Sequence, residues 1–282
     1  MTEASTLTEL APWRDRLGRL SPTRAAAFAV AVTPALWLTA RALGSGLGPE
    51  PLEVALHESG HWAVRLLLLS LAVSPVRRLW GWTALMGVRR MLGLAAFFYA
   101  AGHLTLYAAD QDWRWLHIGG EIVSRVYLAI GFGAVLGLTA LAATSFDRAI
   151  RRLGPKRWRA LHQLVYLVAV LALAHFWMQV RLQDYVEPLV ASGVLGWLFV
   201  LRLAGGGTGR AVALAVVATA MTALGEAAFL YGWFGAPPMQ VLGGNLTAGL
   251  GLRPAWIVGA ITLPLALLPP VRDTSRAVLR AA

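Results

Sequence analysis

Six histidines are the residues of this chain that are best suited to chemistry, since cysteine is absent. Without cysteine there are no disulfides, thiolate metal sites, iron–sulfur clusters or c-type haem attachment. His103, His162 and His175 fall inside long stretches that contain no charged residue. An ionisable side chain at membrane depth is costly and therefore marks a functional site. A lone histidine could simply hydrogen-bond a neighbouring helix, but three on two helices favour ligation of a metal or haem.

His103 and His175 are expected at similar depths on two different helices. His103 lies 13 residues beyond Arg90 on one predicted helix. On the other, His162 lies near the basic end, and His175 follows it by 13 residues. Thirteen helical residues rise by about 20 Å, which brings both histidines toward the outer side. Two neutral imidazoles that face each other suit the axial positions of a low-spin b-type haem. The sequence therefore predicts that His103 and His175 are axial ligands of one haem iron.

His162 predicts a second haem nearer the basic, inner side, but no histidine is expected opposite it. The matching depth on the other helix holds Arg89 and Arg90, which cannot ligate iron but could pair with haem propionates. In one ideal helix, His162 and His175 would lie about 140° apart around the axis. Either the helix is distorted between them, or two haems approach it from different sides.

His57 and His61 form an HExxH motif with Glu58, with the histidines one turn apart on one helix face. This is the zincin pattern, in which two histidines bind zinc and the glutamate is the general base. The motif lies at the edge of a predicted span, Gly60 weakens the helix there, and no plausible third ligand follows. The two histidines could instead supplement the outer haem or contact a partner. His117 follows in an outer loop and is interpreted as an interfacial residue.

The composition is typical of an integral membrane protein. The chain is 57% hydrophobic and 14% charged, whereas soluble domains carry about 25% charged residues. Apolar stretches of about 20 residues can cross the hydrocarbon core as helices. We predict an all-α integral membrane protein with eight spans, at 25–43, 60–76, 91–109, 126–146, 160–180, 186–201, 211–234 and 254–271.

Basic residues are expected to set the orientation of these spans, because lysine and arginine accumulate in cytoplasmic connections. Of the 25 basic residues, 19 lie on one side, together with both chain ends. We therefore predict a multi-pass protein of the bacterial inner membrane with both ends in the cytoplasm. The net charge of +11 then reflects topology, and no nucleic-acid binding is expected. The fourth-to-fifth connection alone carries Arg148, Arg151, Arg152, Lys156, Arg157 and Arg159.

A glycine-rich stretch divides the chain between the sixth and seventh spans. We expect a cytoplasmic leader at 1–24, a six-helix haem-binding domain at 25–203, a linker at 204–210 and a two-helix membrane extension at 211–282. Glu226, inside the seventh predicted span, either relays a proton or hydrogen-bonds a neighbouring helix. A proton-coupled transporter that uses Glu226 and the intramembrane histidines is the alternative function.

Two histidine-bearing stretches, RRMLGLAAFFYAAGHLTLY and RRLGPKRWRALHQLVYLVAVLALAHFWMQV, carry a family resemblance. They resemble the MsrQ (YedZ) family, the haem-binding membrane subunits of a methionine-sulfoxide reductase system within the ferric-reductase-like transmembrane superfamily. The resemblance covers about residues 50–203. It implies that the family's haem histidines fall on His103 in the GHL element, His162 in ALHQL and His175 in AHFW. It further implies b-type haem, with FMN as an additional cofactor.

The resemblance also implies a function. Electrons would pass from quinol or a cytoplasmic flavin reductase to a periplasmic molybdopterin enzyme, MsrP, that repairs oxidised methionine in proteins. The chain would then be a redox subunit of an oxidoreductase rather than a self-contained enzyme. An alternative function is that of a membrane subunit of a ferric or other metal reductase. Two features depart from the family: Arg125-Val126-Tyr127 stands where Arg-Pro-Tyr is common, and the last two spans are additional.

Overall fold

The computed structural model describes residues 11–15, 18–44, 46–181, 184–205, 207–247 and 251–268. The regular structure in these ranges is helical, without strands. Seven helical segments are long and apolar enough to cross a membrane, so the chain is a multi-pass integral membrane protein. The helices that carry these spans are α2 (Pro22–Leu43), α3 (Pro51–Trp80), α4 (Met86–Asp110), α6 (Val126–Ala143), α8 (Leu164–Gln179), α9 (Val186–Ala204) and α10 (Thr208–Phe234).

The predicted all-α membrane fold is confirmed. Seven predicted spans coincide with these seven segments, and α12 (Pro254–Leu267) occupies the eighth as a shorter apolar helix. Parts of the predicted segments lie outside the described residues: 1–10, 16 and 17 of the leader, Gly206 of the linker, and 248–250 and 269–282 of the extension, including the end of the eighth span at Val271.

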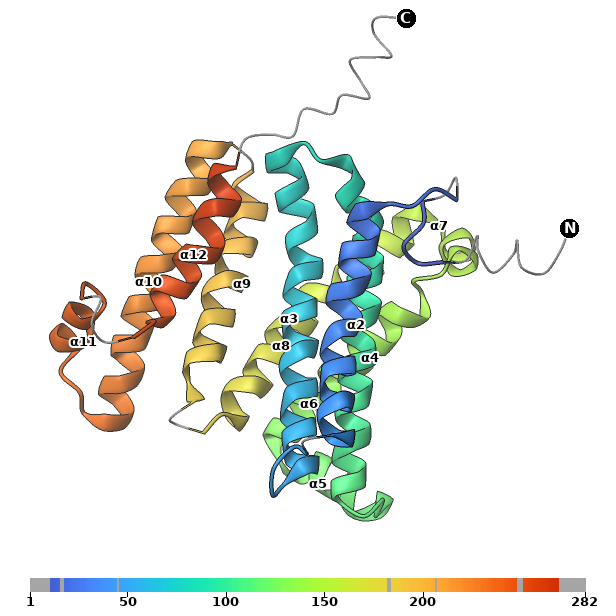
Figure 1. Ribbon diagram of the computed structural model, residues 1–282, viewed down its shortest axis with the longest axis horizontal. Helices are drawn as coiled ribbons and strands as arrows, with labels where there is room; N and C mark the ends of the chain where they lie inside the picture. Colours follow the sequence, from blue (N-terminus) through green and yellow to red (C-terminus); the bar gives the residue numbers. More distant parts are fainter. Residues whose placement is uncertain are drawn as a thin grey trace, which may run out of the picture. The chain divides into compact units, whose positions relative to one another are not determined.

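The chain divides into two compact units. The first comprises Met1–Ser70 and Ala84–His175, and the second comprises Leu71–Thr83 and Phe176–Ala282. In the first unit, α2 packs along α4, and α4 packs against α6 (Figure 1). In the second unit, α9, α10 and α12 form a three-helix bundle (Figure 1).

A tyrosine hydroxyl is inserted into helix α2 beside its internal proline, Pro34. The hydroxyl of Tyr99 on α4 donates to the Ala31 carbonyl at 3.0 Å and accepts from the Ala35 amide at 2.9 Å. Those two backbone groups would pair with each other in a regular helix. An insertion of this kind opens the helical hydrogen-bond ladder, and it links α2 to α4.

Small residues let the helices of the second unit approach closely. A Cβ added at Gly193 of α9 would overlap the Thr222 hydroxyl of α10 and would lie 2.8 Å from Val258 Cγ2 of α12. Helices in membranes associate through such close van der Waals contacts. The bundle is therefore held by backbone proximity as well as by its polar groups.

Three connections form helices that the hydropathy pattern did not predict. These are α5 (Trp115–Ser124), α7 (Asp147–His162) and α11 (Pro238–Gly244). Helix α7 is kinked at Gly154, whose φ of +75° lies in the region that favours glycine. It ends at His162, and α8 begins at Leu164 after a turn. His162 and His175 therefore lie on either side of a break at Gln163 and do not belong to one regular helix.

Candidate functional site

The structure brings His103 of α4 and His175 of α8 together. Their ring centroids lie 6.2 Å apart, and the ring planes are inclined by 80°. Both side chains belong to the first unit and are half-buried. The expectation that these two residues share one depth on different helices therefore agrees with the geometry.

Each of these histidines is hydrogen-bonded to the backbone of a further helix. His103 Nδ1 lies 2.8 Å from the Leu56 carbonyl of α3, and His175 Nδ1 lies 2.8 Å from the Tyr127 carbonyl of α6. A carbonyl can only accept, so each Nδ1 carries the proton and each Nε2 keeps its lone pair. This arrangement, a ring N–H that donates to a backbone carbonyl, is common for histidines that bind metals.

A glycine lies beside each of the two imidazoles, four residues after the carbonyl that holds it. A Cβ built on Gly60 would lie 3.0 Å from His103 Nδ1, and one built on Gly131 would lie 2.6 Å from His175 Nδ1. Real Cβ atoms essentially never come as close as the second distance. Helices α3 and α6 therefore hold the two rings in the same way, with a carbonyl and a glycine one turn apart.

The separation of the two rings fits a pair of axial ligands. Bonds from imidazole nitrogen to a metal are about 2 Å long, so two Nε2 atoms on opposite sides of one ion are about 4 Å apart. The corresponding ring centroids are then about 6 Å apart. The observed 6.2 Å between His103 and His175 matches this value. In the described part of the chain, neither Nε2 has a hydrogen-bond partner.

His162 lies in different surroundings. Its ring stacks on Trp158 of α7 with centroids 3.9 Å apart, and its Nε2 lies 3.2 Å from the Thr144 hydroxyl. Trp158 Nε1 in turn donates to the Thr144 carbonyl at 2.9 Å. Among the described contacts of His162 there is no second histidine. The structure therefore brings together two of the three histidines singled out from the sequence, and it places the third in a separate cluster.

The remaining histidines do not form a metal centre with described residues. His57 and His61 lie within α3, which begins at Pro51, so the HExxH motif is inside a helix rather than at its edge. His57 is exposed, and its Nδ1 lies 3.0 Å from the Glu53 carbonyl. Over the ranges that the structure describes, no group of three or more histidine, cysteine, aspartate or glutamate side chains could hold a metal ion. His117 is exposed on α5.

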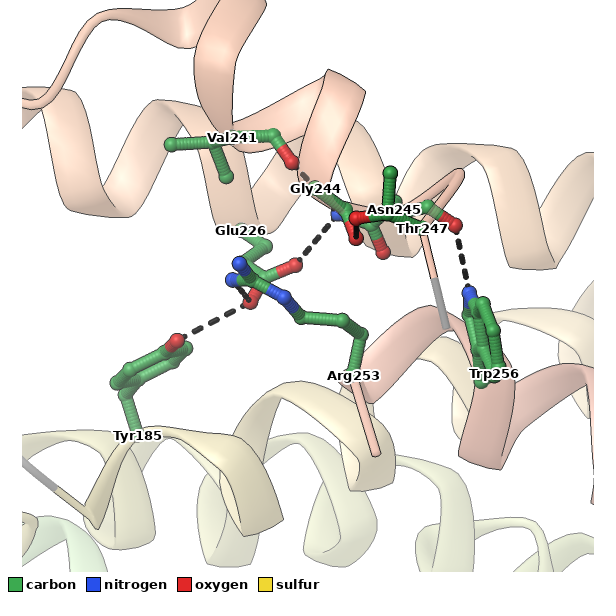
Figure 2. Close-up of polar contacts among 8 residues, drawn as sticks. All are labelled: Tyr185, Glu226, Val241, Gly244, Asn245, Thr247, Arg253 and Trp256. Atoms are coloured by element: carbon green, nitrogen blue, oxygen red, sulfur yellow. Dashed lines mark hydrogen bonds and ion pairs between the residues drawn. The ribbon is translucent and has the colours of Figure 1, made fainter. Parts of the chain in front are cut away.

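A second polar cluster surrounds Glu226 in the other unit (Figure 2). The fully buried carboxylate accepts hydrogen bonds from Asn245 Nδ2 at 2.8 Å, Arg253 Nη1 at 3.0 Å and the Tyr185 hydroxyl at 3.1 Å. Burial and the nearby charge of Glu226 raise the pKa of the Tyr185 hydroxyl, which keeps it protonated as a donor. Trp256 Nε1 donates to the Asn245 carbonyl at 2.7 Å. These contacts favour the prediction that Glu226 hydrogen-bonds its neighbours over the prediction of a proton relay.

The hydrogen-bond partners of His103, His175 and Glu226 were not evident from the sequence. The atoms that hold His103 and His175 are backbone carbonyls, which carry no sequence signal. Asn245 and Arg253 lie in the connection between α10 and α12, 19 and 27 residues from Glu226. The sequence signal for the second cluster was Glu226 itself, because a buried carboxylate in an apolar helix requires hydrogen-bond donors around it.

Comparison with known proteins identifies the relatives of the chain. The family described as ferric reductase like transmembrane component matches residues 59–173, which include His103 and His162. The protein-methionine-sulfoxide reductase heme-binding subunit MsrQ of Rhodospirillum rubrum is 45% identical over 204 residues, covering 72% of this chain and 93% of the relative. The MsrQ of Deinococcus radiodurans is 41% identical over 60% of this chain and 84% of its own length. No solved structure matches.

The match to the Rhodospirillum rubrum protein extends over nearly all of that relative and most of this chain. The protein from Xanthomonas campestris that carries the same name is 43% identical over 168 residues. The helical membrane fold, the ferric-reductase-like segment and these identities agree with one another. The chain therefore belongs to the MsrQ family, the heme-binding subunits of protein-methionine-sulfoxide reductase.

Proposed function

We propose that this protein is a b-type haem subunit that passes electrons across the membrane, with His103 and His175 as the axial ligands of one haem. The observation that carries the proposal is the histidine pair itself. Its centroids are 6.2 Å apart, and both Nδ1 atoms are occupied by backbone carbonyls. Two Nε2 lone pairs are then available for one iron between the helices. The names of the MsrQ relatives support haem as the bound group.

The residues of this chain position the ligands and control their environment. The Leu56 and Tyr127 carbonyls fix the tautomer and the rotation of the two rings, and a ring that donates in this way is also a stronger ligand. Gly60 and Gly131 leave the space that the rings occupy. When bound, haem supplies one-electron exchange at iron, whose potential depends on its axial ligands and burial. No proton transfer by the protein is needed for such a step.

A second haem at His162 is part of the same proposal, with FMN as a further cofactor. The stacking of His162 on Trp158 and the hydrogen bond of that tryptophan to Thr144 hold the imidazole in place. For Nε2 to bind iron, it must give up its contact with the Thr144 hydroxyl. Arg89 and Arg90 are proposed partners for the propionates, and Arg90 then has to exchange its ion pair with Asp147, now at 2.7 Å.

The names of the relatives support a protein-methionine-sulfoxide reductase as the partner system. From the resemblance we further propose a periplasmic molybdopterin enzyme of the MsrP type as the acceptor, and quinol or a cytoplasmic flavin reductase as the donor. We also propose that the chain lies in the bacterial inner membrane with both ends in the cytoplasm, because its basic residues concentrate on one side of the predicted spans. In this proposal residues 25–203 form the haem-binding domain, and 211–282 form a membrane extension after the linker.

An absorption spectrum of the detergent-solubilised protein tests the proposal. Reduced minus oxidised spectra of the wild-type chain are expected to show b-type haem. His103→Ala and His175→Ala are each expected to lose the part of that signal that comes from the haem between these two residues, because either change removes a ligand. His117→Ala is the matched control, since His117 is exposed on α5, and it is expected to keep the signal. A colourless wild-type preparation, or alanine variants that retain full haem, would overturn the proposal.

A further inference from the structure

Helix α7 carries a concentration of unpaired positive charge. Six of its 16 residues are exposed lysines or arginines, and no described residue forms an ion pair or hydrogen bond with any of them. Asp147, the acidic residue in this helix, is already paired with Arg90 of α4 at 2.7 Å. The unpaired residues are Arg148, Arg151, Arg152, Lys156, Arg157 and Arg159.

The two neighbouring helices fix the place of α7 in the membrane. It lies between α6, which ends at Ala143, and α8, which begins at Leu164, and both belong to predicted spans. The connection is too short to carry α7 far from the bilayer, because only three residues precede it and one follows. Figure 1 shows α7 beside the ends of the helices in its unit. With α6 and α8 spanning the membrane, its cations are therefore expected at the level of the lipid headgroups.

The other face of α7 anchors the helix to the protein. Ala149 is buried, and the half-buried indole of Trp158 donates to the Thr144 carbonyl at 2.9 Å. The helix is therefore amphipathic: its apolar side is attached to the protein, and its charged side is free. A helix that lies in the interface with lysine and arginine on its polar face is attracted to anionic lipids.

We propose that α7 is a binding surface for the headgroups of anionic phospholipids. Five of the six cations are arginines, and a guanidinium can bind a phosphate through two parallel hydrogen bonds. Groups of four to eight basic residues next to a membrane span are a common signature of anionic-lipid binding. The kink at Gly154 divides the cations into three on each side, so the helix offers two neighbouring headgroup sites. The proposal does not depend on whether the protein binds haem.

Titration of the detergent-solubilised protein with short-chain phosphatidylglycerol tests this proposal, with short-chain phosphatidylcholine as the zwitterionic reference. The wild-type chain is expected to bind phosphatidylglycerol more tightly, and added salt is expected to remove the preference. The triple variant Arg148→Gln, Arg151→Gln, Arg152→Gln removes three charges. Each lost charge is expected to weaken binding about fivefold, the equivalent of about 1 kcal/mol per basic residue near an anionic surface. The triple variant is then expected to bind about 100-fold more weakly at the site before Gly154, and to keep the site after it.

The matched control is the triple variant Arg148→Lys, Arg151→Lys, Arg152→Lys, which keeps the charge and is expected to keep most of the affinity. The salt dependence of wild-type binding gives a second test if the glutamine variant does not fold. Equal binding of the two lipids by the wild type would overturn the proposal, and a soluble acidic protein would become the candidate partner. Unchanged affinity in the folded glutamine variant would overturn it as well.

Discussion

At the scale of single residues, the orientation of His103 and His175 depends on atoms that lie behind the rings. A carbonyl of one helix turn accepts from Nδ1, and a glycine on the next turn leaves room for the ring. The same arrangement occurs twice, on α3 and on α6. Its geometry differs in one respect: the ring of His175 lies closer to its glycine than the ring of His103 does.

This difference predicts unequal effects of added methyl groups. Gly131→Ala would place Cβ 2.6 Å from His175 Nδ1, whereas Gly60→Ala would place it 3.0 Å from His103 Nδ1. We expect Gly131→Ala to lose most of the bound haem and Gly60→Ala to lose less, because an overpacked ring must shift. Haem-to-protein ratios after purification measure both effects. Gly102→Ala, with no atom within 4 Å of its Cβ, is the control, and equal ratios in all three variants would refute the role of the glycines.

Glu226 gives a second prediction at this scale, for stability rather than cofactor binding. Glu226→Ala removes the acceptor of three hydrogen bonds: Arg253 Nη1 loses its partner, and Asn245 Nδ2 keeps only the Val241 carbonyl. Breaking a buried ion pair in this way costs about 3–5 kcal/mol. Thermal unfolding in detergent is expected to shift clearly downward. Asp147→Asn breaks an exposed pair and is expected to cost about 1 kcal/mol or less, so similar shifts in the two variants would contradict this prediction.

At the scale of elements, the apolar helices could be predicted, because an uncharged apolar stretch of about 20 residues indicates a membrane-spanning helix. Helix α7 was predicted only as a basic connection, since its charges dominate its pattern, and α5 was predicted as a loop. The pairing of His103 with His175 could be predicted from their depth. Their backbone partners could not, because a carbonyl is the same at every position.

The link between α2 and α4 gives a prediction for these elements. Tyr99→Phe removes the hydroxyl that joins the Ala31 carbonyl to the Ala35 amide across the opened ladder. The buried Ala31 carbonyl and the Ala35 amide then lose their partner, and an unsatisfied backbone group costs about 1–3 kcal/mol. We expect a lower thermal unfolding temperature for this variant. Tyr107→Phe is the control on the same helix, because no described residue hydrogen-bonds that hydroxyl; an equal shift there would show that the bridge has no special role.

At the scale of the whole molecule, the proposed orientation places α5 and α7 on opposite sides of the membrane. The chain has no cysteine, so single cysteines can report on this directly. His117→Cys on α5 is expected to react with a membrane-impermeant maleimide added to intact cells whose outer membrane has been made permeable. Lys156→Cys on α7 is expected to react only after the inner membrane is opened. Both side chains are exposed, which makes the pair well matched. The reverse pattern would invert the topology and the proposed direction of electron flow.

The central claim is that one iron is held between His103 and His175, and electron paramagnetic resonance of the ferric protein tests it most directly. Two axial imidazoles give a six-coordinate, low-spin iron. The wild-type chain is expected to show a low-spin signal that is lost in both His103→Ala and His175→Ala, while His117→Ala keeps it. A wild type without a low-spin signal, or a low-spin signal that survives in both variants, would contradict the claim.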